Sequence, residues 1–241
     1  MKVRALILRL LAAVSEALGL NSSYLDIIFR KHTQLIDIMY YPPCSKPDIT
    51  LGTPRHSDVR GITVLMQGEV EVSGLQVLRN GKWVAVEPIP NAFIVDMGDQ
   101  LQVFNKSKSR SNTLFPPENL TMLLLMLMLM LIIYQVVSNG NLTMLLLMLI
   151  ICEVVSNGRL RSVEHRAVTN ASAARISIPM FYGPSEDAFI APTTSLVDEQ
   201  HPARYKGYKF GEFMRIFRSQ ELKNKTVLDH FKIEYTENNG E

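Results

Sequence analysis

The chain has 241 residues, of which 47% are hydrophobic and 20% charged, and its formal net charge is +2. This length suits one good-sized domain or two small ones, and the apolar content excludes a globally disordered chain. The small net charge, without a basic stripe, argues against a nucleic-acid-binding protein. The two cysteines fit neither a disulfide framework nor a C-x-x-C metal motif, so we expect a reducing, cytoplasmic setting.

The first segment, residues 1–32, is predicted to be helical. Gly19 is suited to end a first helix, and the polar residues after it are suited to begin a second one over residues 23–32. A signal peptide is the less favoured alternative, because Arg9 and Glu16 interrupt the apolar run. The apolar residues that recur at helical i, i+3, i+4 spacing are Leu6, Leu10, Ala13, Val14 and Ala17.

The middle of the chain changes to short β-type runs separated by turn residues. Asn80-Gly81 lies between two runs and predicts a tight hairpin, because both residues can take positive φ. Many short strands with regular turns predict a sandwich or jelly roll rather than a parallel α/β sheet. Helical spacing returns over residues 208–218, within a C-terminal helical segment at 186–241. The predicted strands are Ile62–Met66, Leu75–Leu78, Trp83–Val86, Phe93–Met97, Val163–Val168 and Ile176–Phe181.

Residues 104–154 do not fit this β pattern. Positions 122–133 are Leu, Met or Ile without exception, and the nine residues Asn119–Leu127 recur unchanged at Asn141–Leu149. This uninterrupted run is shorter than the roughly twenty residues that a membrane-spanning helix needs, so a membrane-anchored protein is a minor alternative. We interpret the block as an insertion, either a translated retained intron or a genuine loop. A loop this apolar would expose an aggregation-prone surface, which favours the intron.

Two sequence motifs predict a metal site followed by a carboxylate site. On one strand face, the imidazole of His56 and the carboxylate of Asp58 can bind one metal. A distant histidine, for which His165 in a β-like run is the candidate, would complete the 2-His-1-carboxylate set of non-haem Fe(II) oxygenases. Arg175 and Ser177 again share a strand face, and a guanidinium beside a hydroxyl is a good carboxylate receptor. The remaining histidines, His32, His201 and His230, lie outside any ligand spacing and are expected on the surface or in helices.

Six motifs occur along the chain in a characteristic order. They are Tyr40–Cys44, His56-x-Asp58, Gly98–Gln100, Ser156–Arg159, Ser162–Arg166 and Arg175-x-Ser177. Together they resemble the plant iron(II)- and 2-oxoglutarate-dependent dioxygenases, of the flavonoid, salicylate and hyoscyamine hydroxylase types and the downy-mildew-resistance type. The resemblance covers most of residues 5–103 and 155–233. It implies a mainly β fold with flanking helices, a double-stranded β-helix (jelly roll) formed by residues 33–103 and 155–185 and interrupted by the leucine-rich insertion.

The resemblance also implies an activity and its site residues. We expect hydroxylation or desaturation of a small, partly aromatic secondary metabolite, with 2-oxoglutarate decarboxylated to succinate and O₂ consumed. Ascorbate is a further expected reductant, no catalytic side chain is expected beyond the metal centre, and Phe181 is assigned either to the substrate pocket or to the core. The implied Fe(II) ligands are His56, Asp58 and His165. The implied 2-oxoglutarate residues are Arg175, Ser177 and Tyr41.

Three departures from the family pattern keep a competing hypothesis open. Met39 stands where the family usually has an asparagine beside 2-oxoglutarate, and an N-terminal portion that helps cover the barrel is expected to be missing. In addition, 109 positions separate His56 from His165, and joining Val103 directly to Val155 would restore a family-like stretch. The competing hypothesis is a catalytically inactive truncated paralogue or mis-spliced product whose metal site does not assemble.

Overall fold

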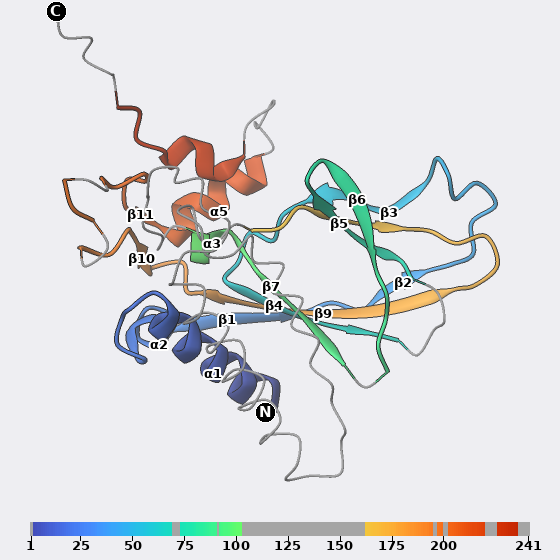
Figure 1. Ribbon diagram of the computed structural model, residues 1–241, viewed down its shortest axis with the longest axis horizontal. Coiled ribbons are helices and arrows are strands. Elements are labelled where there is room, and N and C mark those ends of the chain that lie inside the picture. Colours follow the sequence, from blue (N-terminus) through green and yellow to red (C-terminus); the bar gives the residue numbers. More distant parts are fainter. Residues whose placement is uncertain are drawn as a thin grey trace, which may run out of the picture.

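The computed structural model describes residues 2–68, 73–90, 92–102, 162–194, 197–199, 202–219 and 226–235. The predicted insertion at 104–154 and His201 lie outside these residues. Within them, two antiparallel sheets dominate, with the N-terminal helices on one side of the larger sheet and the smaller sheet on its other side (Figure 1). The expectation of a mainly β protein with flanking helices is therefore confirmed.

The larger, major sheet has the order β1-β9-β4-β7, and β2 also pairs with β9. Its strands are β1 (His32–Ile36), β2 (Met39–Tyr41), β4 (Ile62–Gln67), β7 (Phe93–Met97) and β9 (Arg175–Pro184). The smaller, minor sheet has the order β3-β8-β5-β6. Its strands are β3 (Leu51–His56), β5 (Leu75–Arg79), β6 (Lys82–Val86) and β8 (His165–Val168).

All six predicted strands are present: β7 has the predicted ends, β4, β5 and β6 are each one residue longer, and β8 and β9 differ more. β8 begins only at His165, and β9 extends to Pro184 because it pairs with β1, β2 and β4 along its length. The predicted hairpin joins β5 to β6, with φ of +51° at Asn80 and +74° at Gly81. Positive φ at both central positions matches the right-handed twist of the flanking strands.

The second N-terminal helix is shorter than predicted, whereas the first is as expected. α1 (Lys2–Ala17) agrees with the prediction, and the chain leaves it through Gly19 at φ +73°. α2 (Tyr24–Ile28) stops well before residue 32, because His32 already pairs with β9. His32 is thus not a surface or helix histidine: its ring stacks on Tyr182 at 4.7 Å.

The C-terminal segment is less helical than predicted. α5 (Phe210–Ser219) and the short 3-10 helix η2 (Val227–Phe231) are preceded by a two-stranded ribbon, and η2 carries His230 exposed, as expected. The ribbon strands and the one-turn helix after β7 are β10 (Phe189–Ile190), β11 (Tyr208–Lys209) and α3 (Asp99–Gln102). None of the described helices is long and apolar enough to span a membrane.

The two faces of the major sheet bury different kinds of residue. On β4, Ile62 and Val64 face the main hydrophobic core, which also contains α1, α2, α5 and η2. Thr63 and Leu65, which alternate with them, face the space between the sheets. There Leu65 packs against a small cluster formed by Leu75, Val77 and Val86 of the minor sheet. The helices therefore support the sheet from outside and leave its inner face for a site.

Candidate functional site

A cavity lies between the inner faces of the two sheets. It holds about 810 Å³ of space, open solvent at its mouth included. Every site residue predicted from the sequence lines it: His56, Asp58, His165, Arg175, Ser177, Tyr41 and Phe181. Residues separated by more than a hundred positions in the chain thus meet in one place.

The cavity brings His56, Asp58 and His165 together. Potential metal-binding atoms of the three side chains all lie within 4.8 Å of one another. Asp58 Oδ1 is 3.8 Å from His56 Nε2 and 3.7 Å from His165 Nε2, and Asp58 is only 5% exposed. Two imidazoles and one carboxylate in this arrangement form the donor set that suits non-haem Fe(II).

The local backbone around this cluster differs from the prediction in one respect. β3 ends at His56, so Asp58 is not on the same strand but in the loop that follows. His56 and His165 are register partners, whereas the Asp58 carbonyl accepts a hydrogen bond from the Asp99 N–H at 2.7 Å. The turn at Gly98 has no room for a side chain, because a Cβ there would lie 2.1 Å from the Arg60 carbonyl oxygen. A close backbone contact, rather than strand alternation, therefore positions the carboxylate.

The two histidine rings are oriented by backbone carbonyls. His56 Nδ1 lies 2.8 Å from the Pro54 carbonyl oxygen, and His165 Nδ1 lies 3.0 Å from that of Val163. A carbonyl oxygen only accepts, so each Nδ1 carries the proton and each Nε2 keeps its lone pair. Hydrogen bonds of this kind fix the tautomer of metal-binding histidines.

Burial tunes the acidity of the groups around the cluster. Burial, and then the charge of His165, lowers the pKa of His56, which favours the neutral ring that a metal needs. Burial raises the pKa of Asp99 to about 6, although its contacts with Ser57 and Ser162 oppose the rise. Burial, followed by the nearby carboxylates of Asp58 and Asp99, also raises the pKa of Asp96 well above its ordinary value. Two carboxyl groups beside the cluster therefore have raised pKa values.

A second polar group in the cavity is the buried guanidinium of Arg175. Arg175 and Ser177 are 6% and 3% exposed, and β2 places Tyr41 opposite Arg175. The Arg175 Cζ lies 4.3 Å from the centre of the Tyr41 ring. Burial lowers the pKa of Arg175, yet a guanidinium stays charged at neutral pH. Its Nη2 is buried and has no hydrogen-bond partner in the described part of the chain, which suits the binding of an anion.

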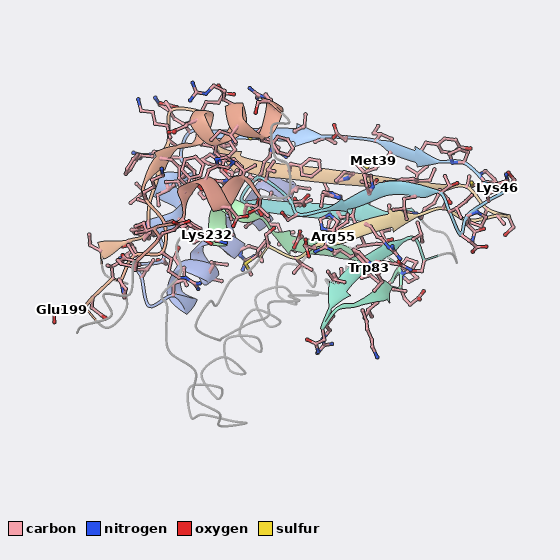
Figure 2. All side chains as sticks on the ribbon, turned by 90° about the horizontal axis from the view of Figure 1, so that it is seen from above. Met39, Lys46, Arg55, Trp83, Glu199 and Lys232 are labelled. Atoms are coloured by element: carbon pink, nitrogen blue, oxygen red, sulfur yellow. The ribbon has the colours of Figure 1, made fainter. Side chains whose placement is uncertain are left out.

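Two neighbours shape the Arg175 pocket, and only one of them stood out in the sequence. Met39, labelled on β2 in Figure 2, accepts a hydrogen bond through Sδ from the Tyr41 hydroxyl at 3.1 Å. Gly74, which the motifs did not mark, leaves room for the guanidinium: a Cβ there would lie 2.2 Å from Arg175 Nε. The Tyr41 hydroxyl also lies 3.1 Å from Thr53 Oγ1.

Two further cavity residues belong to none of the sequence motifs. Thr63 and Asp96 face each other across β4 and β7 and line the cavity. Asp96 is the lone carboxylate in the run Phe-Ile-Val-Asp-Met. It is two residues from Ile94, so the two side chains lie on the same face of β7. Because inward and outward residues alternate along a strand, that isolated charge was the available signal.

An exposed ion pair joins the strands that carry the two histidines. Arg55 on β3 donates to both carboxylate oxygens of Glu164, at 2.9 and 2.5 Å. Figure 2 labels Arg55 beside the minor sheet and Trp83 on its outer hairpin. The bidentate geometry fixes the side chains that flank His56 and His165 in the sequence.

Comparison with known proteins identifies the class to which this site belongs. The profile of the 2OG-Fe(II) oxygenase superfamily matches residues 32–113 and 135–184. The chain therefore belongs to that superfamily, whose cofactor is Fe(II) and whose cosubstrate is 2-oxoglutarate. The match leaves residues 114–134 uncovered, which lie inside the predicted insertion. The bounds of the insertion stay a prediction.

Individual relatives narrow the resemblance to plant enzymes. The chain is 40% identical over 231 residues to the Arabidopsis thaliana protein DMR6-LIKE OXYGENASE 1, covering 95% of this chain and 51% of the relative. It is 31% identical over 231 residues to flavanone 3-dioxygenase 2 of Oryza sativa subsp. japonica, covering 96% and 52%. The chain thus spans about half the length of the curated relatives it matches.

A solved structure confirms the jelly-roll fold. The crystal structure of JOX2 in complex with 2OG, Fe and JA superposes with a TM-score of 0.70 at 26% identity, covering 96% of this chain and 54% of that one. The side chains found here also fit the implied groups. Two Nε2 atoms with free lone pairs and a buried carboxylate suit Fe(II), and a buried guanidinium whose Nη2 has no partner among the described residues suits the carboxylate of 2-oxoglutarate.

Proposed function

We propose that this chain forms the active site of an Fe(II)- and 2-oxoglutarate-dependent oxygenase that hydroxylates or desaturates a small organic molecule. The observation that carries the proposal is one cavity lined both by the His56, Asp58 and His165 cluster and by the Arg175 guanidinium, whose Nη2 has no hydrogen-bond partner in the described part of the chain. Neither group alone identifies this reaction class, because carboxylates and histidines often cluster on proteins. Their combination matches the two separate needs of this chemistry, a metal and a dicarboxylate.

Each residue has a role that follows from its surroundings. His56 and His165 would present Nε2 to Fe(II), and Asp58 would supply the negative charge that helps to retain a divalent ion. Arg175 and Ser177 would bind the distal carboxylate of 2-oxoglutarate. Tyr41 packs against the guanidinium and restricts its orientation. Fe(II), when bound, supplies the O₂ chemistry that couples decarboxylation of 2-oxoglutarate to succinate and CO₂ with oxidation of a substrate C–H bond.

The rest of the cavity favours a small, partly aromatic substrate. Between the two polar groups its wall is apolar, with Leu65, Ile94 and Pro179 from the major sheet. Such a wall excludes water from the reacting groups. Phe181 lines the same cavity and is suited to stack on a ring, which supports the substrate-pocket role over the core role. The flavonoid enzymes among the relatives support this substrate class.

The cellular compartment and the binding partners are proposed in less detail. The free thiol of Cys44 suits a reducing, cytoplasmic compartment. The expected partner is the small-molecule substrate. The alternative, an inactive paralogue whose metal site does not assemble, is not favoured, because the described residues already bring the three candidate ligands together.

The proposal is tested by measuring succinate formation. The purified full chain is supplied with Fe(II), 2-oxoglutarate, ascorbate and O₂, with a panel of flavanones and hydroxybenzoates as candidate substrates. We expect succinate formation that requires both Fe(II) and 2-oxoglutarate, that His165→Ala abolishes, and that the matched surface variant His230→Ala leaves unchanged. Absence of succinate with every candidate, together with absence of metal binding, would overturn the proposal.

A further inference from the structure

A second polar pair lies on the inner face of the major sheet. Thr63 on β4 is the register partner of Asp96 on β7 and of Phe181 on β9. The three side chains therefore form one row across the sheet, and all of them line the cavity. The neighbouring row, formed by Leu65 with its register partners Ile94 and Pro179, is wholly apolar.

Both polar members of this row have buried atoms without a hydrogen-bond partner in the described part of the chain. These atoms are Thr63 Oγ1 and Asp96 Oδ2. The Met97 N–H interacts with the Asp96 carboxyl, but it leaves Oδ2 without a partner. Buried polar atoms are nearly always paired, and an exception next to a cavity is suited to bind something that enters the cavity.

Asp96 does not serve to orient the histidines of the metal cluster. Its Oδ2 lies 3.8 Å from His165 Nδ1, which is too long for a hydrogen bond, and that Nδ1 already donates to the Val163 carbonyl at 3.0 Å. Nor does Asp96 belong to the group of side chains whose ligand atoms converge on one point. It lies beside that group and lines the same cavity.

The side chains of Asp96 and Thr63 are suited to bind a ligand group that can donate a hydrogen bond. Asp58 and Asp99 lie near Asp96, so another anion would be repelled. A hydroxyl group can donate to the Asp96 carboxyl and accept from the Thr63 hydroxyl. Phe181, on the other side of Thr63, offers a ring against which an aromatic substrate would stack.

We propose that Asp96 and Thr63 bind a hydroxyl group of the substrate beside the metal site, so that the enzyme selects phenols or alcohols over their unhydroxylated analogues. This inference rests on the proposed oxygenase function and deepens it. Asp96 is a specificity-determining residue in this account, whereas the metal and 2-oxoglutarate bind without it.

The test measures binding in the absence of turnover. The full chain is loaded with Co(II) in place of Fe(II) and with 2-oxoglutarate, and calorimetry then compares naringenin, a hydroxylated flavanone, with flavanone itself. We expect the wild type to bind naringenin about 10- to 100-fold more tightly, because flavanone would leave the buried polar atoms of Asp96 and Thr63 without a hydrogen-bond partner. Asp96→Leu should reduce this preference to less than about threefold, and Thr63→Val should reduce it partly.

Matched variants separate this role from a merely structural one. Asp96→Asn keeps a side chain of the same shape that can accept a hydrogen bond, so it should keep most of the preference. The exposed variant Asp48→Leu should keep all of it. In every variant we expect Co(II) and 2-oxoglutarate to bind as in the wild type.

The outcomes distinguish this inference from the proposed function. Wild-type protein that binds Co(II) and 2-oxoglutarate but shows no preference for naringenin, or keeps it in Asp96→Leu, overturns the inference alone. Loss of Co(II) binding in both Asp96→Leu and Asp96→Asn also overturns it and places Asp96 in the metal site. Wild-type protein that binds neither Co(II) nor 2-oxoglutarate overturns the proposed function and the inference together.

Discussion

Replacing Gly74 by alanine should weaken 2-oxoglutarate binding without unfolding the protein. A Cβ at position 74 would lie 2.2 Å from Nε and 2.6 Å from Cζ of Arg175, closer than real atoms approach. The guanidinium must therefore move, and the Tyr41 ring 4.3 Å from Cζ restricts where it can go. The backbone of Gly74 does not have the positive φ that excludes alanine, so the effect should come from this contact alone.

The magnitude follows from the hydrogen bonds that Arg175 would lose. A hydrogen bond to a charged group contributes about 1.5–3 kcal/mol, and each 1.4 kcal/mol is about tenfold in affinity. Displacing the guanidinium from one carboxylate oxygen should therefore raise the Kd for 2-oxoglutarate by about 10- to 100-fold. Metal binding should stay unchanged, because the atoms nearest to a Cβ at position 74 all belong to Arg175 and not to the three metal-site residues.

Calorimetric titration of the Co(II)-loaded protein with 2-oxoglutarate measures this change. Gly81→Ala is the matched control, since Gly81 has φ +74° and a Cβ there would meet no described atom within 4 Å. It should destabilise the hairpin by about 1 kcal/mol and leave the Kd for 2-oxoglutarate unchanged. In an Arg175→Met background, Gly74→Ala should cause no further loss. An unchanged Kd in Gly74→Ala, or an equal loss in Gly81→Ala, would refute the reasoning.

Three further predictions concern the same site. Met39→Asn replaces a thioether by the amide that the family resemblance implies, and should tighten 2-oxoglutarate binding by about three- to tenfold in calorimetry; weaker binding would contradict it. The folded protein keeps Asp99 protonated up to about pH 6. The free energy of unfolding of the metal-free wild type should therefore fall relative to that of Asp99→Asn as pH rises from about 4 to 7, by up to about 3 kcal/mol in denaturant titrations. A difference between the two proteins that does not change with pH would contradict this prediction. Since burial lowers the pKa of His56, its imidazole should titrate below the ordinary value of about 6.5 in NMR of the metal-free protein. Titration at or above that value would contradict this direction.

The fold could be predicted where strands carry their own signal. β4 to β7 have apolar runs or a clear turn, and the Asn80-Gly81 hairpin has the conformation that its residues favour. β1 and β3 were missed for a physical reason. β1 is largely exposed, β3 contains a glycine and a proline, and both are strands because of pairing with β9 and β8, more than a hundred positions away. The residues of β1 and β3 themselves therefore carry no clear strand pattern.

The candidate site could be predicted from residue types and spacing, but its details could not. His56, Asp58, His165 and Arg175 stand out because metal and carboxylate binding require those side chains. Asp58 lies beyond the end of its strand, and Gly74 leaves room for Arg175; both depend on contacts between the two sheets. No short stretch of sequence contains such contacts.

Metal binding by the three candidate ligands is the central claim, and an anaerobic titration with Fe(II) in the presence of 2-oxoglutarate tests it most directly. The wild-type chain of 241 residues and the surface variant His230→Ala should each bind a single Fe(II) per chain, whereas Asp58→Ala and His165→Ala should bind none under the same conditions. Wild-type protein that binds no Fe(II), or His165→Ala and Asp58→Ala proteins that bind it as tightly as the wild type, would contradict the account.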